Sequence, residues 1–230
     1  MSWFQDLFRS AVGKKAVMAL SGLVLFGFVL VHMLGNLKAY QGAEAFNAYA
    51  AGLREIGVPE LPYGGALWIA RSVLLAAAVL HIWAAWAVTM ESRKARPVAY
   101  SRPLTSHTSY ASRTLRWGGV ILLLFVVYHL LHLTFGTLHP DFQAETNGQF
   151  HAYHNFVTGF RVWWVSAFYI VANLALGLHL YHGLWSLFQS LGWNHPRYNL
   201  WRRRFAQTFS LVVTAGNVSF PLAVLSGLIR

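Results

Sequence analysis

The sequence contains no cysteine and few charged residues, and both shortages narrow what the chain can be. Without thiols there are no disulfides, thiolate-held iron–sulfur clusters, cysteine-ligated zinc sites or thioether-attached haems. Charged residues make up 11% of the 230 residues, and 56% are hydrophobic, whereas a typical soluble domain is about 25% charged. So few charges cannot cover a soluble surface, and the mean hydropathy of +0.44 predicts an integral membrane protein.

Acidic residues are also scarce, and the formal net charge is +11. In a soluble protein this excess would suggest a nucleic-acid partner, but no segment combines clustered basic residues with aromatic platforms, so we expect no nucleic-acid binding. The first residues, MSWFQDLFRSAVGKK, are amphipathic and lack the short apolar core and small-residue cleavage site of a signal peptide. We therefore expect no cleaved leader, and we expect the basic residues to set orientation in the membrane.

Five apolar runs are long enough to cross a bilayer as helices, which takes about 20 residues each. They lie at 15–36, 66–90, 115–138, 162–189 and 205–228. The sequence therefore predicts an all-α protein, with residues 1–230 forming a single polytopic membrane domain of five helices. In the longest connection, the stretch AEAFNAYAAGLREIG has the pattern of a short amphipathic helix at the membrane surface.

The basic residues predict which side each end of the bundle faces. Thirteen lysines and arginines fall at the end that holds the N-terminus, and five fall at the other end. Because basic loops stay in the cytoplasm, the N-terminus is expected inside and the C-terminus outside. The thirteen are Arg9, Lys14, Lys15, Arg93, Lys94, Arg96, Arg102, Arg113, Arg116, Arg197, Arg202, Arg203 and Arg204, and the five are Lys38, Arg54, Arg71, Arg161 and Arg230.

Six of the eleven histidines lie within the predicted spans, and the first four spans each carry at least one. Ionisable groups in hydrocarbon are costly and usually have both a partner and a purpose. A single such histidine is as well explained by a hydrogen bond to a neighbouring helix, but that reading does not readily account for the distribution over four spans. The six are His32, His81, His129, His132, His179 and His182.

Four helices with one histidine each could hold two haems, each iron bound axially by two neutral imidazoles. At 1.5 Å per residue, His32 and the pair His129 and His132 fall on the outer half of the bilayer. His81 and the pair His179 and His182 fall on the inner half. Depth therefore predicts one haem between spans one and three and another between spans two and four.

Depth leaves open which histidine of each doublet binds iron, because residues three apart share one broad helix face. On depth alone, His132 matches His32 slightly better than His129 does. Glycines on the same four spans would permit close approach of a flat macrocycle, although ordinary helix packing explains any one of them nearly as well. These glycines are Gly22, Gly27, Gly35, Gly118, Gly119, Gly177 and Gly183.

Over nearly its whole length the chain resembles the single-subunit, five-helix, di-haem cytochrome b anchors of succinate dehydrogenases and fumarate reductases. The stretches that carry the resemblance are SGLVLFGFVLVHMLGN, GAEAFN, LLAAAVLHIWAAWAV, VVYHLLH and LHLYHGLWSLFQSLGW. The resemblance implies that the axial ligands are His32 and His129 for the outer haem b, and His81 and His179 for the inner one. Some relatives carry a membrane Glu two residues before the last ligand, where this chain has Gly177.

The resemblance also implies the partners and the reaction. A cytoplasmic flavoprotein with FAD and an iron–sulfur subunit would perform the succinate chemistry, and electrons would pass through the two haems to a quinone, namely menaquinone. Nothing in this chain resembles a dicarboxylate or flavin site, and no catalytic residue is assigned. The chain is therefore expected to be the subunit of an oxidoreductase complex that lacks the dicarboxylate site, in a bacterial cytoplasmic membrane and in contact with lipid. The complex can also form a higher oligomer.

Two other classes of function remain open at this stage. One is the di-haem anchor of another quinone-linked oxidoreductase, of the nitrate reductase or hydrogenase type. The other is a proton-coupled transporter with a histidine relay, although internal repeats and broken helices are not evident. His151 and His154, in QFHAYHNF, have helical spacing and could pair on a metal, but surface histidines are the better interpretation.

Overall fold

A computed structural model of the chain describes residues 8–95, 110–146 and 148–230. The described residues form an all-helical bundle with five helices long and apolar enough to cross a membrane, and the chain is a multi-pass membrane protein. Residues 1–7 of the amphipathic start MSWFQDLFRSAVGKK lie outside these residues, as do Arg96 and Arg102.

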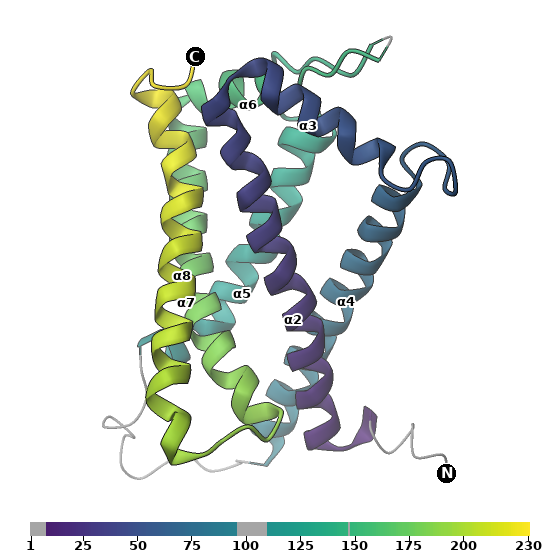
Figure 1. The fold of residues 1–230 in the computed structure, drawn as a ribbon. Helices are drawn as coiled ribbons and strands as arrows, with labels where there is room; N and C mark the ends of the chain where they lie inside the picture. Colours follow the sequence, from purple (N-terminus) through teal and green to yellow (C-terminus); the bar gives the residue numbers. More distant parts are fainter. Residues whose placement is uncertain (1–7, 96–109, 147) are drawn as a thin grey trace.

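The five long helices alternate in direction (Figure 1). They are α2 (Ala11–Asn36), α4 (Gly65–Lys94), α5 (Tyr110–His129, continued by the turn η2, Leu130–Thr134), α7 (Trp163–Ser190) and α8 (Pro196–Leu225). Helix α4 packs on α2, α5 packs on α7, and α7 packs on α8 along its length. The N-terminal and C-terminal ends of the chain therefore lie at opposite ends of the bundle, as five crossings require.

Two short helices cover the end of the bundle where the C-terminus lies (Figure 1). After η1 (Leu37–Gln41), helix α3 (Ala43–Glu55) confirms the amphipathic helix predicted from the sequence. Helix α6 (Ala152–Arg161) was not predicted, and its buried Phe156 packs on Phe46 of α3 with ring centroids 5.4 Å apart. The backbone N–H of Tyr153 donates to Asn47 Oδ1 at 3.0 Å, which joins the two short helices.

Several helix ends differ from the predicted span limits, two of them for clear local reasons. The third span ends at Thr134 rather than at residue 138, because Gly136 adopts φ 74° and stops the helix. The fifth begins at Pro196 rather than at residue 205, because proline fits the first turn of a helix and the His195 side chain accepts from the backbone N–H of Arg197 at 3.2 Å. Basic residues thus occupy the first turns of α8.

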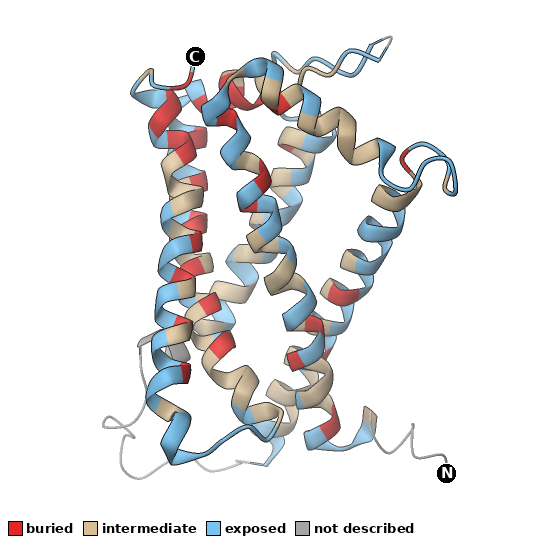
Figure 2. Cartoon of the chain, viewed as in Figure 1, coloured by how far each residue is buried: buried red, intermediate tan, exposed pale blue. Residues whose placement is uncertain are grey.

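The tightly packed core lies toward the end of the bundle that holds the C-terminus, which is the predicted outer end, rather than at its middle (Figure 2). It joins the ends of α2, α7 and α8 to α3 and α6. By contrast, the buried residues of α4 are only Ala77 and Ala84 among those described, and most of its surface is apolar and exposed. An exposed apolar helix surface suits lipid contact. The residues of the buried core are Met33, Ala39, Phe46, Phe156, Val157, Phe160, Val165, Tyr169, Phe220, Ala223, Val224 and Ile229.

Ion pairs and exposed tryptophans lie at both ends of the bundle. Lys14 of α2 forms an ion pair with Glu91 of α4 at the basic end of the bundle. At the opposite end, Arg54 Nε lies 3.7 Å from Glu145 Oε2. Tryptophans near the helix ends are exposed, as interfacial anchors are; they are Trp68, Trp117, Trp163, Trp164 and Trp201.

Candidate functional site

Four histidines from four different helices meet in two pairs. The rings of His32 on α2 and His129 on α5 have centroids 5.8 Å apart, toward the outer end. The rings of His81 on α4 and His179 on α7 have centroids 6.2 Å apart, toward the basic end. These are the four residues named by the resemblance. The pairs link the first span with the third and the second with the fourth, as depth predicted.

The spacing of each pair fits two imidazoles on opposite sides of one iron. A metal–nitrogen bond to histidine is about 2 Å long, and a ring nitrogen lies about 1 Å from the ring centroid, so the two centroids would be about 6 Å apart. No group of three or more ligating side chains occurs in the part of the chain that the structure describes. A site with two protein ligands suits an iron whose remaining ligands come from a macrocycle, and does not suit structural zinc, which needs four.

The inner pair has one ring held by backbone and one ring with an unsatisfied nitrogen. His81 Nδ1 lies 3.0 Å from the Met18 carbonyl oxygen, so it carries the proton and donates, which leaves Nε2 free for a metal. Ser21 Oγ is 3.4 Å from the same nitrogen. His179 Nδ1 is buried without a hydrogen-bond partner. Buried polar atoms normally have hydrogen-bond partners, so this ring lacks one that the described residues do not supply.

Gly22 makes room for the His81 ring on α2. A Cβ at this glycine would lie 3.1 Å from His81 Cε1, closer than ordinary packing allows. Gly35 and Gly177 instead meet Tyr49 and Thr214, so these two serve helix packing, which the sequence had left open. Beyond the adjoining part of its own helix, a Cβ at Gly27, Gly118, Gly119 or Gly183 would meet none of the described residues within 4 Å.

The outer pair is held by side chains of the packed core. His129 Nδ1 lies 3.2 Å from the hydroxyl of Tyr169 on α7. The depth-based preference for His132 as the partner of His32 was wrong. His132 is 2% exposed, and its ring stacks on His139 with centroids 4.9 Å apart.

A single π turn explains why the two histidines of this doublet diverge. In η2, the backbone N–H of Phe135 donates to the Leu130 carbonyl at 2.8 Å, which is a five-residue step. A π turn spreads residues further around the helix axis than an α turn does. Residues 129 and 132 are therefore rotated further apart than the sequence spacing had assumed, although both rings still reach the hydroxyl of Tyr169.

The second doublet diverges without a π turn. His179 meets His81, whereas His182 Nε2 lies 3.1 Å from Ser186 Oγ, one turn further along α7. Ser186 also lines a cavity between α2 and α7 at the basic end. The other residues that line it are Lys15, Met18, Gln189 and Ser190.

Residues that the sequence did not indicate complete the surroundings of the outer pair. Tyr169 lies 40 residues from His129 in the chain, and its only signal was a hydroxyl within a predicted span, which needs a partner. His139 is buried, with Nε2 donating to the Asn155 carbonyl at 2.9 Å and Nδ1 accepting from the Asp141 N–H at 3.2 Å. Nothing in the sequence had set it apart from the other loop histidines.

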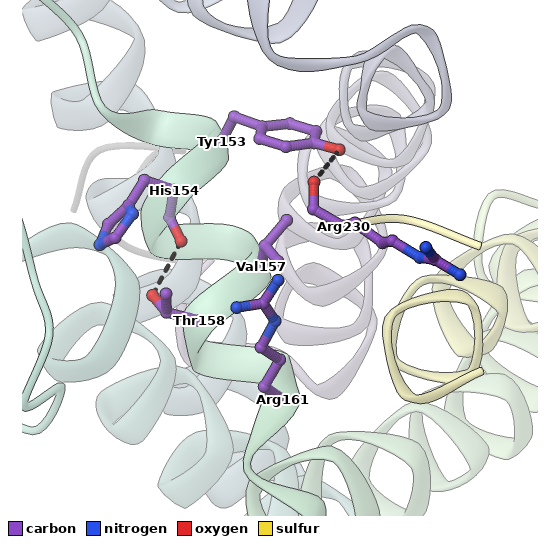
Figure 3. Close-up of a pocket in the computed structure, with 6 residues that line it drawn as sticks. All are labelled: Tyr153, His154, Val157, Thr158, Arg161 and Arg230. Atoms are coloured by element: carbon purple, nitrogen blue, oxygen red, sulfur yellow. Dashed lines mark hydrogen bonds between the residues drawn. The ribbon is translucent and has the colours of Figure 1, made fainter. Parts of the chain in front are cut away.

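A further cavity, of about 190 Å³, opens beside α6 at the outer end (Figure 3). His154 and Arg161 line it, and the hydroxyl of Tyr153 donates to the Arg230 carbonyl at 2.9 Å. His154 Nε2 donates to the Asp141 carbonyl at 3.1 Å, and His151 lies at the N-cap of α6. Neither joins a group of three metal ligands among the residues described.

Arg202 does not belong to an open basic surface, although it was counted with the cytoplasmic cations. It is 2% exposed, and its guanidinium donates to the Trp193 carbonyl at 2.5 Å and to Asn194 Oδ1 at 2.8 Å. It also hydrogen-bonds Asn199 and lies over the Trp185 ring. These contacts fix the connection between α7 and α8, whereas Arg203 and Arg204 are exposed.

A comparison with protein families identifies the kind of membrane subunit. The family model described as succinate dehydrogenase/fumarate reductase transmembrane subunit matches residues 92–218, more than half of the chain. The chain belongs to this family. No curated protein and no solved structure matches the chain.

The matched segment contains only half of the paired histidines of this transmembrane subunit. His129 and His179 lie inside residues 92–218, and His32 and His81 lie before them. The spatial pairing of the last two with the first two therefore rests on the packing of α2 against α7 and α8, and of α4 against α2. The role of all four as iron ligands stays a prediction.

Proposed function

We propose that this chain is the cytochrome b anchor of a bacterial succinate dehydrogenase, a succinate:menaquinone oxidoreductase, and that it binds two haems b. The observation that carries the proposal is the pairing of rings at 5.8 Å and 6.2 Å on four helices of a chain in this family. His32 and His129 would hold the outer haem, and His81 and His179 the inner one.

The chain supplies ligation, burial and orientation, while bound haem b supplies a one-electron iron couple. Neutral imidazoles suit the apolar interior better than carboxylates do. His81 is oriented by the Met18 carbonyl and His129 by the Tyr169 hydroxyl, which aim the other nitrogen of each ring at its partner helix.

The partners follow from the family and from the basic end of the bundle. An iron–sulfur subunit and a flavoprotein with FAD would dock on the cytoplasmic side, where Arg93, Lys94, Arg203 and Arg204 present positive charge. Arg202 is excluded from this surface because its guanidinium is engaged by the α7–α8 connection. The family match favours this complex over a nitrate reductase or hydrogenase anchor and over a histidine-relay transporter.

Purification from membranes tests the proposal. We expect a reduced-minus-oxidised spectrum typical of haem b, two haems per chain, and copurification of a covalently flavinylated subunit and an iron–sulfur subunit. A molybdopterin or nickel subunit in place of the flavoprotein would contradict the assignment to succinate dehydrogenase. Absence of any b-type spectrum would end the haem proposal.

A further inference from the structure

The hydroxyl of Tyr169 lies between the two histidines of the first doublet. It is 3.2 Å from His129 Nδ1 and 3.0 Å from His132 Nδ1. Tyr169 is 4% exposed and packs within the outer core, where its ring also contacts Phe160 with centroids 4.9 Å apart. The hydroxyl therefore has these two nitrogens as its partners in a site that excludes water.

Hydrogen counting gives this bridge a direction. A tyrosine hydroxyl has one hydrogen, and each nitrogen of a neutral imidazole is either a donor or an acceptor. If Nε2 of His129 binds iron, Nδ1 carries the hydrogen and must donate to the Tyr169 oxygen. The hydroxyl hydrogen then points to His132 Nδ1, and His132 carries its own hydrogen on Nε2.

We propose that Tyr169 is a positioning residue for the outer haem, fixing the tautomer and orientation of His129 and lowering the reduction potential of that haem. The proposal rests on the proposed function, because it takes His129 as an iron ligand. Donation from Nδ1–H makes the imidazole a stronger ligand, which favours iron(III) over iron(II).

The far end of the bridge is held rigidly. The His132 ring stacks on His139 at 15° between ring planes, and His139 is fixed by Asn155 and Asp141 backbone groups. A Cβ at Gly159 would lie 2.8 Å from His132 Cε1, so α6 approaches this ring closely. His132 is thus a fixed acceptor for Tyr169, which gives it a part that depth and resemblance had not assigned.

The inner pair uses a different device, so the two sites can be told apart by mutation. His81 Nδ1 donates to a backbone carbonyl, which no side-chain substitution removes. The outer bridge depends on one phenolic oxygen. Tyr128 offers a matched control. Its ring contacts the ring of Tyr169, and its hydroxyl is also buried but has no hydrogen-bond partner among the described residues.

The test compares Tyr169→Phe with Tyr128→Phe in the purified complex by spectroelectrochemical titration of both haems. His32→Ala, which is expected to lose the outer haem, assigns the titration waves. For Tyr169→Phe we expect the preference of the outer site for iron(III) over iron(II) to fall on the order of tenfold. For a one-electron couple, this raises the reduction potential of the outer haem by about 59 mV. The inner wave, and both waves of Tyr128→Phe, should stay in place.

A second variant decides the matter if Tyr169→Phe does not assemble. His132→Leu removes the acceptor of the hydroxyl and should raise the outer potential by a smaller amount, since linked hydrogen bonds strengthen one another. Two retained haems with unshifted waves, or equal shifts in the two tyrosine variants, would overturn the role of Tyr169. A parent protein without haem b would instead overturn the proposed function.

Discussion

Within each histidine doublet, one ring faces the partner helix and the other forms contacts of its own. His129 lies beside His32, whereas His132 turns to Tyr169 and His139. In the same way His179 lies beside His81, whereas its neighbour one turn on contacts Ser186. The two members of a doublet should therefore respond differently to removal of the ring.

Single replacements by alanine test this difference. His32→Ala, His81→Ala, His129→Ala and His179→Ala should each lose one haem per chain, because one axial ligand is removed from an iron with two. His132→Ala and His182→Ala serve as matched controls and should keep both. Haem is counted by pyridine haemochrome against chain concentration. Loss of haem in His182→Ala but not in His179→Ala would reverse the assignment of the inner ligand.

At the scale of elements, helix contacts explain features that looked like cofactor chemistry in the sequence. Gly177 lies on α7 where α8 approaches most closely, and a side chain there would run into Thr214. The position at which some relatives carry a membrane Glu is therefore filled by a helix–helix contact. At Gly183, six residues further along α7, a Cβ would meet none of the described residues within 4 Å beyond the adjoining part of its own helix.

Substitution of these two glycines by alanine should have opposite effects. Gly177→Ala forces Thr214 and α8 to shift, and overpacking of this kind costs about 1 to 3 kcal/mol. Gly183→Ala should be neutral or stabilising by up to about 1 kcal/mol, because alanine favours the helix more than glycine does. Thermal unfolding in detergent measures both. Equal stability of the two variants would show that the α7–α8 contact is looser than described.

At the scale of the whole molecule, the bundle is held asymmetrically. Helices α3 and α6 and the ends of three long helices form a buried core at one end (Figure 2). The other end carries most of the basic residues and is joined by the Lys14–Glu91 ion pair and the Arg202 contacts. The proposed orientation would turn the basic end toward the soluble subunits and the packed core away from the cytoplasm.

Reporter fusions test the orientation. Alkaline phosphatase fused after Arg230 should be active, because that end is expected outside, whereas a fusion after Gly192 in the α7–α8 connection should be inactive. A fluorescent protein that folds only in the cytoplasm should give the reverse result at the same two sites. Activity of the phosphatase at Gly192 alone would mean that the bundle has the opposite orientation.

The sequence predicted most of the fold because the physical signals are local. Five apolar runs gave the five long helices, and the amphipathic pattern after Gly42 gave α3. Boundaries failed at Gly136 and Pro196, where backbone conformation rather than hydropathy ends or begins the helix. Helix α6 was missed because it is short and is buried by tertiary contacts.

The composition by itself determined the class of protein, and the spacing of histidines along alternating helices determined which spans come together. The depth of a residue in the membrane follows from its position in the sequence, because a helix has a fixed rise per residue. Rotation about the helix axis is different, because the π turn at Leu130–Thr134 changes it and distant side chains decide which ring is held. Only the tertiary structure therefore separated His129 from His132 and brought Tyr169 between them.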